Sequence, residues 1–290
     1  MSTSHDRSGN IAAARLRYVL IDAARADSSY WSDLTYLPIV PERFRAQPEL
    51  FPILVDIHAL GAEGHTKILQ RAASSEQQDG VQYIHAFLDA ATEPSALAAH
   101  LIRRMSVRRP DGVEDVLRFY DPFVFRHLRW LLDVHQLDGL LGPVSQWYWP
   151  EPDGMWHSQL RVSDHASLRP LRLTPEQWPT LLRMADLNVA LRKLSHLGFM
   201  QQHDTSTAQQ IDRLLAEAWG GHGMSDRQDR LLFAIQASYY HRHIHKHPVL
   251  QSRLNQAATG AMTFVTACAD LDDPKMRQLA EELEQIHANQ

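Results

Sequence analysis

The stretch Val116-Leu117-Arg118-Phe119-Tyr120-Asp121-Pro122 indicates a strand that stops abruptly and becomes a helix over residues 123–132. Asp121 suits the N-cap, because its carboxylate accepts hydrogen bonds from free backbone N–H groups of the first turn. Pro122 suits the first helical position, where a missing N–H costs nothing. Apolar residues then recur on one helix face, at Phe125, Leu128, Leu131 and Leu132. This joint contains no nucleophile, so it predicts a mixed α/β scaffold rather than a catalytic elbow.

Outward from this joint, the first half of the chain alternates strand-like and helix-like segments. The apolar and alternating patterns predict strands at residues 18–21, 51–57, 81–88 and 114–120, with a hairpin over 144–149 and 155–162. Helices are expected between them, at residues 23–34, 66–77 and 92–105. Prolines at positions 38, 41 and 48 predict loops and turns.

The pattern changes near Pro170, after which only helices are indicated. Thr174-Pro175-Glu176-Gln177 has the form of a capping box with proline at the first position. Helical periodicity then predicts helices at 174–196, around 211–218, 226–239, 248–268 and 274–287. We therefore predict an α+β protein: a mixed α/β lobe with a small sheet at residues 17–165, and an all-helical lobe at 166–290. Residues 1–16 are expected to be poorly ordered.

The composition excludes several classes of protein. The chain has 290 residues and a net charge of -5, which disfavours a nucleic-acid partner because such proteins usually carry a basic excess. A single cysteine rules out an intramolecular disulfide and suits a reducing compartment. The polar N-terminus lacks the apolar region of a secretory signal, and no run of about 18 apolar residues predicts a membrane span. We expect a cytoplasmic protein without a membrane partner.

Motifs for phosphate binding, acyl transfer and thiolate zinc binding are absent from the sequence. The histidines at positions 241, 243, 245 and 247 would share faces in pairs if this segment were helical, and such a pair can hold a metal. A solvated helix end, where histidine suits the helix dipole, is the favoured interpretation. The sequence predicts no catalytic residue, no cofactor and no metal.

Three carboxylates follow or end presumed strands, namely Asp22, Asp56 and Asp121. Strand ends often line a ligand crevice in α/β sheets, so these residues and the run His241–His247 form an alternative hypothesis, a metal-dependent hydrolase. The simpler interpretation is that Asp121 caps its helix, that the other two satisfy turns, and that Arg118 pairs with Asp121.

The predicted hairpin is crowded with Trp147, Tyr148, Trp149 and Trp156. Because neighbouring strand residues face opposite sides, Trp147 and Tyr148 cannot share one face. At least one of these rings is therefore expected at the surface or between the lobes. Trp147, Trp149 and Trp156, with Tyr239 and Tyr240, are our candidate partner-binding residues, since such rings dominate binding hot spots. For the hairpin rings, a place in the core or between the lobes is the favoured interpretation.

The order of these segments resembles a known family. Tyr18-Val19-Leu20-Ile21-Asp22 is followed by Phe51-Pro52-Ile53-Leu54-Val55, by Leu101-Ile102-Arg103-Arg104, by Arg118-Phe119-Tyr120-Asp121-Pro122 and by Gly142-Pro143. This order is similar to that of the Tap/TEC adaptor chaperones of bacterial type VI secretion. The resemblance covers about residues 17–150, and residues 225–254 are similar to the family's helical part.

The resemblance implies a non-enzymatic role: binding a toxic effector and helping to load it onto the VgrG spike protein. It brings no catalytic residues, and Arg118, Tyr120, Asp121 and Pro122 are expected to be structural. Effector contact is expected to involve the helical lobe, whose amphipathic segments can receive a partner helix in a groove. A scaffold component without cargo remains a third hypothesis.

Overall fold

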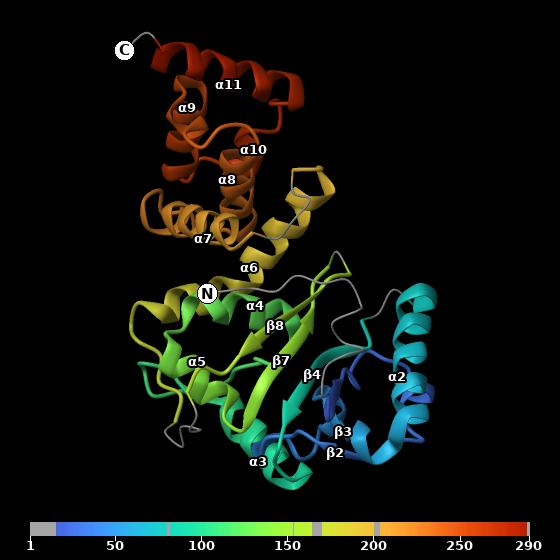
Figure 1. Cartoon of the computed structure of the whole chain (residues 1–290). Coiled ribbons are helices and arrows are strands. Elements are labelled where there is room, and N and C mark those ends of the chain that lie inside the picture. Colours follow the sequence, from blue (N-terminus) through green and yellow to red (C-terminus); the bar gives the residue numbers. More distant parts are fainter. Residues whose placement is uncertain (1–15, 80–81, 153, 164–169, 200–203, 289–290) are drawn as a thin grey trace. The chain divides into compact units, whose positions relative to one another are not determined.

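The computed structural model describes residues 16–79, 82–152, 154–163, 170–199 and 204–288 (Figure 1). The chain divides into two compact units, residues 1–178 and 179–290. The sequence had placed this boundary at residues 165 and 166. The predicted disorder of residues 1–16 lies outside the described residues, except for Leu16, which packs against the core of the first unit.

The first unit is built on a six-stranded sheet in the order β2-β3-β1-β4-β7-β8, and every neighbouring pair is antiparallel. Its strands are β1 (Tyr18–Ile21), β2 (Tyr36–Pro38), β3 (Ile53–Asp56), β4 (Ile84–Ala90), β7 (Val144–Pro150) and β8 (Trp156–Leu160). A separate two-stranded ribbon joins β5 (Ser106–Arg108) to β6 (Glu114–Val116). The predicted α+β class is therefore confirmed.

Helices cover both faces of this sheet. α2 (Ile57–Asp79) lies on one face, and α3 (Pro94–Met105), α4 (Pro122–Leu131) and α5 (Val134–Leu141) lie on the other (Figure 1). On the α2 face, Ile68 packs into a cluster with Val19 and Phe87. Because both faces are covered, the central strand β1 is buried along its whole length.

The predicted joint between strand and helix at residues 116–122 is confirmed in part. Asp121 is the N-cap of α4, and its Oδ1 accepts a hydrogen bond from the N–H of Phe123 at 2.9 Å. Pro122 takes the first helical position. The predicted strand is too long: it ends at Val116, and it pairs with β5 in the two-stranded ribbon. Residues 117–121 are irregular, and a hydrogen bond from the N–H of Asp121 to the carbonyl of Arg118 closes a turn.

The predicted helix at residues 23–34 is wrong. The structure has turns there and a short 3-10 helix, Ser28–Tyr30. Two aspartates explain the difference, because their side chains bond to nearby backbone N–H groups and compete with helix formation. Asp22 accepts from the N–H groups of Ala24 and Arg25, and Asp27 accepts from that of Ser29.

The second unit is helical in its described part. It contains most of α6 (Gln177–His196), then α7 (Thr205–Gly220), α8 (Arg227–Tyr239), α9 (Pro248–Ala258), α10 (Phe264–Ala267) and α11 (Asp273–Ala288). The single helix predicted over residues 248–268 is wrong. Gly260 has a φ of +72° and separates α9 from α10, because glycine adopts this left-handed conformation without a steric penalty.

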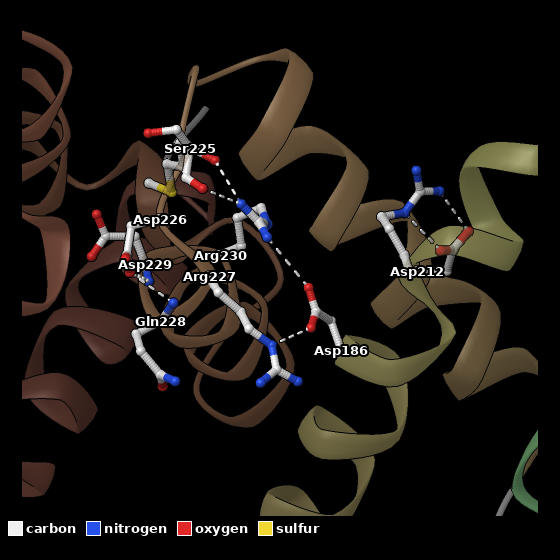
Figure 2. A network of polar contacts seen from close by, with 10 residues as sticks. Asp186, Asp212, Ser225, Asp226, Arg227, Gln228, Asp229 and Arg230 are labelled. Atoms are coloured by element: carbon white, nitrogen blue, oxygen red, sulfur yellow. Dashed lines mark hydrogen bonds and ion pairs between the residues drawn. The ribbon is translucent and has the colours of Figure 1, made fainter. Parts of the chain in front are cut away.

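Carboxylates tie the helices of the second unit together (Figure 2). Asp186 of α6 pairs with Arg227 and Arg230 of α8, with Nη2 of Arg230 at 3.4 Å. Asp212 of α7 receives hydrogen bonds from Nε of Arg183 at 3.0 Å and from Oγ1 of Thr180 at 2.7 Å, both on α6. Such charge-assisted bonds are stronger than neutral ones, so they fix the three helices against one another.

Candidate functional site

Two of the motif residues, Arg118 and Tyr120, belong to a polar cluster in the first unit that is centred on a buried carboxylate. We call it the Asp22 cluster, and it comprises Asp22, Arg25, His85, Arg118 and Tyr120. Asp22 follows β1 and His85 lies on β4, so the cluster joins two neighbouring strands to the turn that precedes α4.

Asp22 is the centre of this cluster and is only 2% exposed. Its Oδ2 lies 2.8 Å from Nε of Arg25 and 2.9 Å from Nε2 of His85. Burial alone would raise the pKa of Asp22, but the hydrogen bond and charge of His85, together with Arg25, lower this pKa well below its usual range. The carboxylate is therefore ionised at neutral pH, and its partners hold it in place.

Tyr120, which belongs to the motif, packs against the buried histidine of the cluster. Its ring stacks on the imidazole of His85, with centroids 5.7 Å apart and ring planes at 21°. The guanidinium of Arg118 lies over the Tyr120 ring at 5.6 Å and reaches to 3.7 Å from Oδ2 of Asp121. Burial raises the pKa of Tyr120 to about 12, so its hydroxyl stays protonated at neutral pH. Of the motif residues, only Arg118 is strongly exposed.

The aromatic hairpin belongs to the core, which corrects part of our partner-binding prediction. Trp147 and Trp149 are both 0% exposed. Phe125 of α4 stacks on Trp147 with centroids 4.9 Å apart and packs against Trp149 at 5.1 Å. Tyr148 points to the opposite face and joins the cluster under α2. The sequence argument assumed one exposed face, whereas helices cover both.

A buried ion pair holds Trp149 in the core. Oε1 of Glu151 accepts a hydrogen bond from the indole N–H of Trp149 at 2.9 Å, and Oε2 accepts one from Nη1 of Arg126 at 3.2 Å. Arg129 lies over the Trp149 ring at 4.7 Å. The indole N–H of Trp149 is hydrogen-bonded and its ring is packed inside the protein, so Trp149 offers no surface to a partner.

The other candidate partner residues are partly exposed. Trp156 packs against Phe87 at 5.2 Å. In the second unit, the hydroxyl of Tyr240 donates to Asp273 at 3.0 Å, and Tyr239 accepts from Arg277 at 3.1 Å. Phe199, which is 43% exposed, contacts the Tyr239 ring at 6.0 Å. We call Phe199, Tyr239 and Tyr240 the aromatic patch, and its role in binding stays a prediction.

Two of the three strand-end carboxylates, Asp22 and Asp56, lie apart in the sheet. Tyr18 pairs with Asp56, and Ile21 pairs with Ile53, so antiparallel pairing places Asp22 and Asp56 at opposite ends of β1 and β3. Asp56 accepts from the N–H of Ala59 and pairs with Arg17 at 3.6 Å. The crevice argument holds for parallel strands, whose carboxyl ends share one edge.

The histidine run is not helical, because α8 ends at Tyr239 and residues 244–246 form a 3-10 helix. His245 stacks on Phe233, whereas Nδ1 of His247 caps α9 by accepting from the N–H of Val249 at 3.2 Å. In the described parts of both units, no three side chains of the His, Cys, Asp or Glu type are grouped so that they could hold a metal. The metal-binding pairs at four-residue spacing, an alternative that the sequence left open, therefore do not form. The favoured interpretation, a solvated helix end, is wrong for His245 and His247, which are 7% and 6% exposed.

Sequence reasoning missed His85, Arg126 and Glu151. His85 is 1% exposed, and Arg126 and Glu151 are 8% and 7% exposed. A polar residue inside the apolar run Tyr83-Ile84-His85-Ala86-Phe87 was the available signal, because a buried polar side chain needs a partner. The identity of that partner, Asp22, required the strand order.

Together these features define an α+β protein whose N-terminal sheet is closed on both faces and whose C-terminal unit is helical. Residues 17–139 match a family model described as Domain of unknown function (DUF4123). The matched segment runs from β1 into α5 and contains the whole Asp22 cluster. No curated protein and no solved structure matches the chain. No described helix is both long and apolar enough to cross a bilayer.

Proposed function

We propose that this protein is a cytoplasmic adaptor chaperone of type VI secretion. It binds a toxic effector and helps to load it onto the VgrG spike, and it catalyses no reaction. The observation that carries the proposal is the family match over residues 17–139, because this domain family is known for type VI effector chaperones. The match includes Arg118, Tyr120, Asp121 and Pro122.

The geometry of the first unit supports a binding role. Its motif residues stabilise a turn and a helix start, and its buried carboxylate Asp22 is enclosed by its own partners. The alternative, a metal-dependent hydrolase, is less well supported, because Asp22 and Asp56 lie at opposite ends of β1 and β3 and Asp121 caps α4. Replacing Asp121 is therefore expected to change stability rather than any turnover.

The second unit offers exposed apolar side chains suited to a partner. Leu182 and Trp219 are each 59% exposed, and Phe199 is 43% exposed. Large apolar side chains on a surface often mark interaction sites, and aromatic residues dominate their energetics. We place effector contact at the aromatic patch of this unit.

Co-purification from the native host tests the proposal. The full chain carries an affinity tag, and mass spectrometry identifies the proteins that elute with it. An effector encoded beside the gene is expected in the eluate, and its recovery on VgrG is expected to fall when the gene is deleted. Normal effector loading in the deletion strain would contradict the proposed function.

A pair of variants locates the contact. Phe199→Asp puts a charge into the aromatic patch, whereas Leu160→Asp puts the same charge at an exposed position of β8, where the leucine is 58% exposed. Effector recovery is expected to fall with Phe199→Asp and to stay unchanged with Leu160→Asp. Equal recovery with both variants would remove the aromatic patch as the contact while leaving the adaptor role intact.

A further inference from the structure

The second unit contains a pocket of about 290 Å³ with an apolar floor and a basic rim. Its floor is formed by Leu214 of α7, Phe233 of α8 and His245, which are 7%, 1% and 7% exposed. The walls come from one face of α7 and from the turn that follows α8. A pocket of this size admits one or two side chains and is near the lower limit for small-molecule sites.

The rim carries more positive than negative charge. Arg213, Arg242 and Lys246 line the pocket, with Glu217 as the opposing carboxylate. Glu217 is itself within 3.9 Å of His222. Among the described residues, no carboxylate forms a salt bridge with Arg213, Arg242 or Lys246, although most other ionic side chains here have partners. This local excess of positive charge is opposite in sign to the net charge of the chain, which is -5.

The floor stays uncharged at neutral pH. The imidazole of His245 stacks on Phe233 with centroids 3.6 Å apart and planes at 6°. Burial, assisted by the neighbouring His222, lowers the pKa of His245 to about 3. The Nε2 atom of His245 is buried and has no hydrogen-bond partner among the described residues. The pocket therefore combines a neutral aromatic floor with cations at its edge that form no salt bridge among the described residues.

We propose that this pocket binds an acidic segment of a partner protein, in which a carboxylate lies beside an apolar side chain. The apolar side chain would occupy the floor over Leu214 and Phe233, and the carboxylate would pair with Arg213 and Arg242. Arginine suits this role because its planar fork pairs with both carboxylate oxygens. The binding of a carboxylate also relieves the mutual repulsion of like charges that share one small site.

This inference rests on the proposed function, since it names the chemistry of the partner that the adaptor would receive. Charge complementarity mainly gives specificity and a faster association rate, and it weakens as salt rises. The pocket would thus select acidic cargo segments, and the exposed apolar residues of the unit would supply the remaining contact area.

A labelled peptide tests the pocket directly. The probe is a fluorescein-labelled peptide of alternating glutamate and leucine, and its control replaces every glutamate by glutamine. Fluorescence anisotropy with the full chain is expected to detect the glutamate peptide at least about tenfold more tightly than the control, with weaker binding as salt rises from about 50 to about 500 mM. Equal binding of the two peptides would overturn the inference, and so would binding of inorganic phosphate that displaces the glutamate peptide completely.

Two charge-reversed variants assign the binding to the pocket. Arg213→Glu with Arg242→Glu reverses the charge of two of the three rim cations. Arg192→Glu with Lys193→Glu makes the same change of charge at exposed positions of α6. The first variant is expected to lose at least about tenfold in affinity and the second less than about twofold. Equal losses would show a general charge effect and refute the pocket. Failure here leaves effector co-purification by the wild-type chain unaffected, so the two proposals fail separately.

Discussion

The Nε2 atom of His85 lies 2.9 Å from Oδ2 of Asp22, and both side chains are almost completely buried. The two residues are far apart in the sequence but lie at the same end of β1 and β4. Replacing this ionised carboxylate leaves the buried groups that face it without their acceptor. We therefore expect Asp22 to contribute measurably to the stability of the first unit.

Replacing Asp22 by asparagine is expected to lower the free energy of unfolding by about 3 kcal/mol, measured by urea titration at neutral pH. Asp33→Asn is the matched control, because Asp33 pairs with Lys67 and Arg71 but is 46% exposed. Its cost is expected to be below about 1 kcal/mol. A similar loss of unfolding free energy in Asp22→Asn and Asp33→Asn would show that burial does not increase the contribution of Asp22 to stability.

The contribution of Asp22 depends on pH in a defined direction. Its pKa is lower in the folded protein than in the unfolded chain, so its stabilising effect is complete above about pH 4 and declines as pH falls further. The difference in unfolding free energy between wild type and Asp22→Asn is expected to be larger at about pH 6 than at about pH 3. A difference that does not change over this range would contradict the ionised state of Asp22.

Gly142 is expected to tolerate no side chain. Its φ is +57°, and a Cβ atom there would lie 2.0 Å from Cε1 of His100. Gly142→Ala is expected to cost more than about 3 kcal/mol, whereas Gly112→Ala, with φ +86° and no atom nearer than 4.0 Å, is expected to cost about 1–2 kcal/mol. Adding His100→Ala to Gly142→Ala is expected to recover part of the loss in thermal denaturation. If the stability losses of Gly142→Ala and His100→Ala simply add in the double variant, the steric contact between the two residues is excluded.

His245 predicts a loss of stability in mild acid. Because burial lowers its pKa to about 3, the unfolded chain binds a proton below about pH 6.5 that the folded protein does not. Wild type is therefore expected to lose about 2 kcal/mol more than His245→Phe between about pH 7 and pH 5. Urea unfolding followed by circular dichroism at about pH 7 and at about pH 5 measures these free energies. An equal loss of stability in wild type and His245→Phe would refute the prediction.

Asp212 is expected to hold α7 to α6. Asp212→Asn weakens the bonds from Arg183 and Thr180, and its cost is expected to be about 2 kcal/mol because these bonds are charge-assisted and mostly buried. Asp270→Asn is the control, since Asp270 is 58% exposed in its pair with Arg253 and should cost under about 1 kcal/mol. The protection of α7 amides from hydrogen exchange provides a second measurement. Unchanged protection in Asp212→Asn would argue against a role of Asp212 in holding α7 to α6.

Local signals predicted local structure well. Asp121 and Pro122 start α4, and Asp226 caps α8 by accepting from the N–H groups of Gln228 and Asp229. These outcomes depend on residues close in the sequence, whose hydrogen bonds need no distant partner. Gly198 likewise follows the end of α6 with a φ of +74°.

Features that depend on strand order could not be predicted in this way. The sequence did not show that β1 and β3 are antiparallel, and this pairing separates Asp22 from Asp56. It also did not show that both sheet faces are covered, which buries Trp147 and Tyr148 together. The rim of the basic pocket joins α7 to the turn after α8, so its charges converge only in the folded unit.

The strand order also constrains how the chain can fold during synthesis. β4 can pair with β1 once residue 90 has been made, but the partner of its other edge, β7, begins only at Val144. Until the ribosome has released that segment, an apolar strand stays unpaired along one side, and such edges promote aggregation. Slow translation between residues 90 and 144 would prolong the time for which this edge is unpaired. Nascent chains halted in this range are therefore expected to bind ribosome-associated chaperones more than chains halted after residue 160.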